Sequence, residues 1–168
     1  YQAYSWIVLV QCVLAALGCA LLGRKLGLRY LAATCAGLAF GFSGYLVSKA
    51  LFLSVMQSLP WLPWVLLCLI AGVESGVWGW FIGAAAAFAL AIYGGHPQMV
   101  FYIAVASALV LLWLLLAPGR VGRGRRFART ALGGGGALVL GAALAAAQLV
   151  PTFNFFQFTA IRTSSSTE

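Results

Sequence analysis

"QAYSWIVLVQCVLAALGCALLG", residues 2–23, is an apolar run long enough to cross a bilayer, because about twenty apolar residues in a helix span the hydrocarbon core. Its apolar residues are continuous rather than alternating, which is typical of a membrane helix and not of a barrel strand. Hydrophobic residues make up 64% of the chain and charged residues 7%, and the mean hydropathy is +1.03. These values exclude an ordinary soluble domain. The expected environment is a lipid bilayer.

The rest of the chain divides into further apolar runs of the same kind. Together they predict a single all-α domain over residues 1–168, a polytopic transmembrane helix bundle of about six spans. Pro60 and Pro63 are expected to bend the third span, which starts near residue 58 or as early as Leu51, because proline removes a backbone donor. The spans are expected near residues 2–23, 31–48, 58–73, 77–93, 98–117 and 131–150.

Small residues are concentrated in three of these spans. Residues 83–87 and 132–147 are rich in glycine and alanine, and Gly37 and Gly41 form a GxxxG pair. Small side chains let neighbouring helix backbones approach closely. We therefore expect these helices to pack inside the bundle.

Basic residues cluster in two of the connections, residues 24–29 and 118–130. Four spans separate the two clusters, so both are expected on one side of the membrane, and their positive charge predicts that this side is cytoplasmic. Residues 49–57, 94–98 and 151–168 are then expected at the outer face. The net charge of +8 is interpreted as a signal for orientation in the membrane, and not as a nucleic-acid site. The basic residues are expected to contact anionic lipid head groups.

The single histidine of the chain, His96, lies in the outer stretch "GGHPQ" at residues 94–98. The glycines permit unusual backbone angles, and Pro97 suits the first turn of a helix. Because a helix N-terminus favours anions, His96 and Gln98 are candidate ligands for a phosphate or an anionic sugar donor. The alternative is a tight turn with a hydrogen-bonded histidine. A metal site is not indicated, since the chain has no second histidine and no aspartate.

Lys49 and Arg162 are isolated cations on the expected outer face. A cation at the membrane boundary either pairs with a phosphate or extends its side chain to water. Pro151 predicts that the sixth span ends or breaks there, which exposes backbone carbonyls to polar side chains or a ligand. Three polar residues near this proline are candidates for supporting roles: Gln148, Asn154 and Gln157.

Carboxylates are almost missing from the chain. Glu74 falls in an expected inner loop, Glu168 ends the sequence, and there is no aspartate. General acid-base catalysis usually needs a positioned carboxylate or histidine. An enzyme built on this chain would therefore use His96 or a base outside residues 1–168. Because the sequence begins inside an apolar run and without methionine, we expect it to be a piece of a longer membrane domain.

Three stretches carry a resemblance to a known family: "AGLAFGFSGYLVSKALFLSVMQSLPWLPWVLL", "GGHPQMVFY" and "AAAQLVPTFNFFQFTAIR". In this order and spacing, over roughly residues 30–162, they resemble the YfhO family of bacterial polytopic membrane proteins, within the GT-C-type glycosyltransferases. The resemblance implies a GT-C-like fold in the bacterial inner (cytoplasmic) membrane. It also implies that a lipid-linked sugar binds at the outer face, where the sugar is transferred from its polyprenyl-phosphate carrier.

The resemblance also implies roles for particular residues. These are supporting roles at the carrier phosphate or the donor sugar, assigned to four residues because they share the expected outer face: Lys49, His96, Gln98 and Arg162. The resemblance also implies that the catalytic carboxylate lies upstream of Tyr1. No cofactor is implied within these residues, whereas a divalent metal is compatible with the complete protein.

Other functions stay open at this point. A helical chain almost without carboxylates suits a non-catalytic accessory or scaffold subunit bound to other membrane subunits. A membrane histidine among six tryptophans and eleven phenylalanines also suits a pigment-binding subunit. A transporter is less favoured, because the spans have almost no ionisable residues to couple ion movement.

Overall fold

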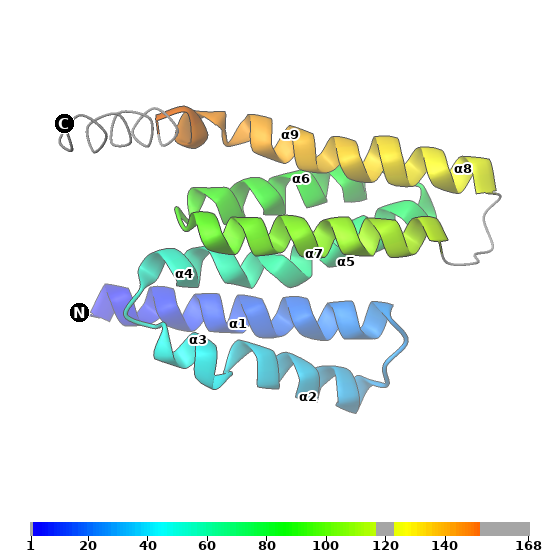
Figure 1. Ribbon diagram of the computed structural model, residues 1–168. Coiled ribbons are helices and arrows are strands. Elements are labelled where there is room, and N and C mark those ends of the chain that lie inside the picture. The colour runs from blue at the N-terminus through cyan, green and yellow to red at the C-terminus, as the bar shows by residue number, and fades with distance from the viewer. Residues whose placement is uncertain (1, 117–122, 152–168) are drawn as a thin grey trace, which may run out of the picture.

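The computed structural model describes residues 2–116 and 123–151, and within these ranges the ordered elements are all helices. The predicted all-α class is confirmed. Figure 1 shows the helices running side by side as a bundle, with α1 and α2 at one edge and α8 and α9 at the other. In chain order the elements are α1 (Gln2–Lys25), α2 (Tyr30–Gly41), α3 (Gly44–Ser48), α4 (Leu53–Ser58), η1 (Leu59–Trp61), α5 (Leu62–Ser75), α6 (Trp78–Tyr93), α7 (Pro97–Leu116), α8 (Arg123–Ala128), η2 (Arg129–Gly135) and α9 (Gly136–Leu144).

Five helical segments within the described ranges are long and apolar enough to cross a bilayer. Helix α6 is apolar but shorter, with 16 residues. At 1.5 Å per residue it is about 24 Å long, less than the thickness of the hydrocarbon core. The chain is thus a multi-pass membrane protein by the length and composition of its helices. The five segments are Gln2–Lys25, Tyr30–Ser48, Leu53–Ser75, Pro97–Leu116 and Gly124–Leu144.

The second and third spans differ from their predicted form. The second is interrupted between α2 and α3, where the Ser43 hydroxyl accepts a hydrogen bond from the Leu46 amide (3.4 Å) and starts a new helix. The third begins at Leu53, close to the earlier of its two predicted starts, Leu51, so part of the expected outer segment is helical. Pro60 and Pro63 do not break it, because each lies in the first turn of a helical segment, where its missing donor costs little.

The sixth span also differs from its predicted form. Its helix starts at Arg123 instead of residue 131, so most of the basic cluster is helical and not a loop. A π-helical stretch, Arg129–Gly135, then precedes α9. Helical residues continue through 146–151, after a turn at Ala145. Glu74, expected in a loop, lies in the last turn of α5.

Glycines allow the closest helix contacts, as expected. A Cβ on Gly41 would lie 2.5 Å from the Cys12 carbonyl oxygen of α1, so α1 and α2 touch through their backbones. On the other side of the bundle, a Cβ on Gly141 of α9 would lie 2.7 Å from the Ala85 carbonyl oxygen of α6. Such contacts are accessible only to glycine.

The buried core is centred on α5 and α6. Val65 and Leu69 of α5 pack with Phe88 of α6 and Ile103 of α7. In contrast, many large apolar side chains of α1, α2 and α7 are exposed, among them Trp6, Leu31 and Leu116. In a membrane bundle this outer surface is the lipid-facing one, because lipid tails are as apolar as these side chains.

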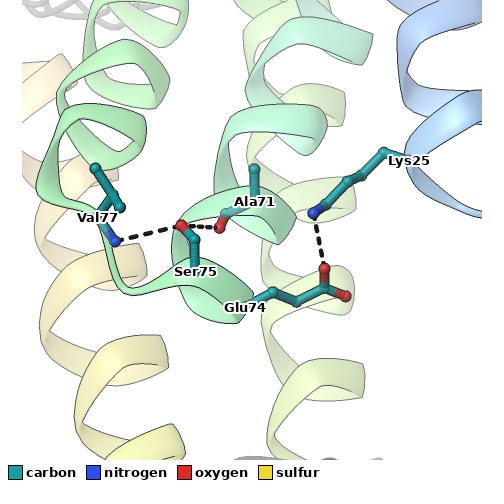
Figure 2. Close-up of polar contacts among 5 residues, drawn as sticks. All are labelled: Lys25, Ala71, Glu74, Ser75 and Val77. Atoms are coloured by element: carbon teal, nitrogen blue, oxygen red, sulfur yellow. Dashed lines mark hydrogen bonds and ion pairs between the residues drawn. The ribbon is translucent and has the colours of Figure 1, made fainter.

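One ion pair ties α1 to the C-terminal end of α5. Lys25 Nζ lies 2.9 Å from Glu74 Oε2 (Figure 2). Beside it, the Ser75 hydroxyl donates to the Ala71 carbonyl (2.7 Å) and accepts from the Val77 amide (3.3 Å), which shapes the turn into α6. The ion pair and this turn lie at the same end of the bundle.

Replacing Glu74 by glutamine is expected to lower the free energy of unfolding by no more than about 1 kcal/mol. The side chains of Lys25 and Glu74 are 32% and 53% exposed, so water screens their attraction. A double-mutant cycle with Lys25→Gln, followed by tryptophan fluorescence during detergent denaturation, measures the coupling. A coupling free energy above about 2 kcal/mol would mean that the pair is far less solvated than this.

Candidate functional site

The two basic clusters lie at one end of the bundle. Lys25 reaches Glu74 at the end of α5, and the guanidinium of Arg129 lies against Gly76, two residues further on. Lys25 of the first cluster and Arg129 of the second therefore contact the same end of α5. We call this end, which carries Arg24, Lys25, Arg29, Arg125, Arg126 and Arg129, the basic end.

Three of the four predicted site residues meet at the opposite end. Lys49 follows α3, His96 precedes α7, and Gln98 is the second residue of α7; all three line one cavity of about 490 Å³. In Figure 1 the α3–α4 link and the α6–α7 turn lie at the same end of the bundle. We call this space the Lys49 cavity; it is lined by Tyr45, Lys49, Phe52, Val55, His96, Gln98, Met99 and Tyr102.

Lys49 is held by the turn that links α3 to α4. Its amide donates to the carbonyls of Tyr45 and Leu46 (both 3.1 Å), and its own carbonyl accepts from the Phe52 amide (2.8 Å). The Lys49 ammonium lies 5.0 Å from the centroid of the Phe52 ring, within range of a cation–π interaction. The Tyr4 hydroxyl of α1 donates to the neighbouring Ala50 carbonyl. The lysine residue is half-buried.

His96 caps the start of α7 through its backbone. Its carbonyl accepts hydrogen bonds from the amides of Met99 (3.0 Å) and Val100 (3.2 Å), which starts the helix at Pro97 as expected. The side-chain Nδ1 is buried and has no hydrogen-bond partner among the described residues. The alternative prediction was a tight turn with a hydrogen-bonded histidine. Among the described residues, Nδ1 of His96 makes no such hydrogen bond. An unsatisfied buried polar atom is costly, and it points to a missing partner.

Gln98 and Tyr102 form a pair one turn apart on α7. The Gln98 side-chain amide donates to the Tyr102 hydroxyl oxygen (2.7 Å), which leaves the tyrosine proton to donate to another acceptor. Gln98 is also the second residue of the helix, so its backbone amide has no hydrogen-bond acceptor within the helix. Both groups are donors at the positive end of the α7 dipole.

Two glycines set the position of the His96 turn. Gly95 has a left-handed backbone (φ 74°), which other residues rarely adopt. Gly94 packs against the end of α4, where a Cβ would lie 2.8 Å from the Ser58 amide nitrogen. The Tyr93 hydroxyl donates to the Leu144 carbonyl of α9 (3.0 Å). The turn is thus fixed against both α4 and α9.

The remaining predicted residues lie elsewhere. Gln148 is half-buried, and a Cβ on Gly95 would lie 3.5 Å from its Nε2, so it approaches the turn without lining the Lys49 cavity. Arg162, Asn154 and Gln157 lie outside the described residues.

Tyr45, Phe52 and Tyr102 line the cavity but were not predicted as site residues. Tyr45 and Tyr102 each lie four residues from a predicted residue, a helical spacing that brings side chains together and would have indicated them. Phe52 has no such signal, because its position depends on the irregular link after α3.

The cavity has the charge of an anion site. Lys49 carries a positive charge, and the chain's carboxylates are Glu74, which is paired at the basic end, and Glu168, outside the described residues. One ammonium, an amide and tyrosine hydroxyls suit phosphate oxygens. They do not fit a divalent metal, which prefers several carboxylate or imidazole ligands. Within the described ranges, no three His, Cys, Asp or Glu side chains gather into a metal-binding group.

No family model, curated protein or solved structure matches this chain. The resemblance to the YfhO family therefore stays a prediction from the quoted stretches.

Proposed function

We propose that this protein is a GT-C-like membrane glycosyltransferase that binds the phosphate of a polyprenyl-phosphate sugar in the Lys49 cavity. One observation carries the proposal: Lys49, His96 and Gln98, from two elements far apart in sequence, line the same cavity. The resemblance to the YfhO family supplies the reaction. The membrane in question is the bacterial inner membrane.

The cavity walls suit an amphipathic ligand. Lys49 neutralises phosphate charge, and the Gln98 backbone amide and the Tyr102 hydroxyl donate to its oxygens. The buried Nδ1 of His96 gains a partner if it donates to the same phosphate or to the sugar. The apolar lining residues Val55 and Met99 suit the first part of a prenyl chain. Together these groups bind and orient the carrier.

The sidedness of the bundle supports an outer-face site. The Lys49 cavity lies at the end opposite the basic end, and basic residues mark the cytoplasmic side of membrane proteins. The polyprenyl-phosphate sugar is then bound at the outer face, as the resemblance implies.

The residues of this chain supply binding and not the whole of catalysis. Glu74 forms an ion pair with Lys25 at the basic end, away from the Lys49 cavity, so it is not positioned to assist the transfer. In this proposal the catalytic carboxylate belongs to a segment outside residues 1–168. Any divalent metal would be held by such carboxylates as well.

Lys49→Ala and His96→Ala in the complete protein are each expected to lower sugar transfer by about 10- to 100-fold. Each removes a charged or hydrogen-bonding partner of a phosphate, worth about 1.5–3 kcal/mol. The assay follows transfer from a radiolabelled polyprenyl-phosphate sugar in proteoliposomes. Arg29→Ala, which removes one charge at the basic end, is the matched control. Unchanged transfer in both cavity variants, or an equal loss in the control, would exclude the site.

A second candidate function is that of an accessory subunit without catalysis. It is favoured by one observation, that the only described carboxylate is ion-paired at the end away from the cavity. Under this alternative the complete protein binds lipid-linked sugar but transfers none, and it co-purifies with other membrane subunits. Transfer by the purified protein alone decides between the two.

A further inference from the structure

A second cavity lies at the basic end of the bundle, where the turn between α5 and α6 faces α8 and η2. Its volume is about 330 Å³. Arg125 and Arg129, one helical turn apart, provide its charge, and its apolar lining includes Trp78, Phe81 and Leu132. We call this space the Arg129 cavity.

Arg129 is fixed in this cavity by the end of α5. Gly76 ends that helix with a left-handed backbone (φ 71°). A Cβ at Gly76 would overlap the Arg129 guanidinium, so the glycine both turns the chain and makes room for the cation. The guanidinium therefore lies near the negative end of the α5 dipole, which favours a cation there. This contact fixes the position of the Arg129 guanidinium but does not supply a negatively charged partner for it.

The charges of this cavity have no carboxylate partner among residues 2–116 and 123–151. Glu74 is the one acidic residue in these ranges, and Lys25 holds it at 2.9 Å. Two guanidinium groups that line one cavity without a counter-ion favour binding of a phosphate, with which arginine forms paired hydrogen bonds.

The walls of the cavity indicate an amphipathic ligand and not a small soluble anion. Trp78 is 69% exposed and Leu132 is 73% exposed, so both present apolar surface outward beside the cavity. In a membrane protein this surface faces lipid tails, and tryptophan is enriched at the depth of the head groups. A ligand here contacts arginines with its head and apolar side chains with its tail.

We propose that the Arg129 cavity is a specific site for an anionic phospholipid, whose phosphate binds Arg125 and Arg129 while an acyl chain lies along Trp78 and Leu132. This site lies at the opposite end of the bundle from the Lys49 cavity and is independent of the proposed function. It is also more specific than a general attraction of the basic clusters to the membrane surface.

The test uses native mass spectrometry of the complete protein in detergent with phosphatidylglycerol or phosphatidylcholine of identical acyl chains. We expect preferential binding of phosphatidylglycerol, and an affinity about tenfold lower in the Arg125→Gln/Arg129→Gln variant. The matched control, Arg24→Gln/Arg29→Gln, removes the same charge from the other basic cluster and is expected to change the affinity by less than about twofold. Equal losses in both variants would overturn the proposal.

Two further measurements use the wild-type protein, so they do not depend on how the variants fold. A photoactivatable phosphatidylglycerol is expected to crosslink to peptides that contain residues 78–81 or 125–133. Crosslinking that favours residues 24–32 would contradict the site. Inorganic phosphate at the concentration of the lipid is expected not to displace it. Full displacement by phosphate would identify a site for soluble anions in place of the lipid.

Discussion

Replacing Gly37 and Gly41 together by leucine is expected to lower the free energy of unfolding by more than about 3 kcal/mol. At Gly41 an added Cβ would lie 2.5 Å from the Cys12 carbonyl oxygen and 2.8 Å from the Ala16 amide nitrogen. At Gly37 it would overlap the Ala16 carbonyl oxygen. Because these obstacles are backbone atoms of α1, no rotamer change relieves them. Helix α2 has to move away from α1.

Detergent denaturation followed by tryptophan fluorescence measures this loss. The matched control is Gly79→Leu/Gly136→Leu, in which the added Cβ atoms meet no neighbour at Gly136 and only Val77, at 3.9 Å, near Gly79. The control is expected to be as stable as the wild type or slightly more stable, since leucine has a higher helix propensity than glycine. Equal destabilisation of both pairs would show that the α1–α2 contact is not the cause.

Replacing Gly94 by valine is expected to disturb the Lys49 cavity together with the stability of the bundle. A Cβ there would overlap the Ser58 hydroxyl and lie 2.9 Å from the Gln57 carbonyl carbon, so the α6–α7 turn cannot remain against α4. We expect a loss of about 2 kcal/mol in the free energy of unfolding. We also expect faster modification of His96 by diethyl pyrocarbonate, measured by peptide mass spectrometry.

Gly95→Ala is the matched comparison for this turn. Its left-handed backbone (φ 74°) strains an alanine by about 1 kcal/mol, but the nearest atom to the new Cβ is Gln148 Nε2 at 3.5 Å. The alanine variant is therefore expected to lose less stability and to keep His96 protected. If the valine variant protects His96 as well as the alanine variant does, the packing of Gly94 on α4 does not hold the histidine in place.

The membrane character and the sharing of one end by the basic clusters were predictable from the sequence. Both depend on composition and on counting spans, and they do not require knowledge of which helix touches which. The start of α7 was predictable too, because Pro97 follows two glycines and a histidine.

The internal arrangement was not predictable in the same way. Helix α1 is apolar on nearly every side, so its sequence does not indicate which face meets α2 or α5. The break before α3 depends on a serine cap, a signal too common to be decisive in an apolar span. The basic cluster was predicted as a loop because its charges interrupt the apolar run, although arginine is a good helix former.

Lys49 and His96 line one cavity because of how the spans pack, and the hydropathy of the sequence does not indicate that packing. Each residue was selected from its expected side of the membrane, and Gln98 was selected with His96 from the helix start. Their shared cavity required the structure. The role of Gly76 in making room for Arg129 required it as well, since the two residues are far apart in the chain.

The shortness of α6 has a consequence for the bilayer around this protein. Trp78, which lines the Arg129 cavity, begins the helix, and the turn that holds His96 of the Lys49 cavity follows its last residue. About 24 Å of helix separates these points, less than a hydrocarbon core of about 30 Å. The hydrocarbon layer between the two cavities would then be thinner along α6 than in the surrounding bilayer.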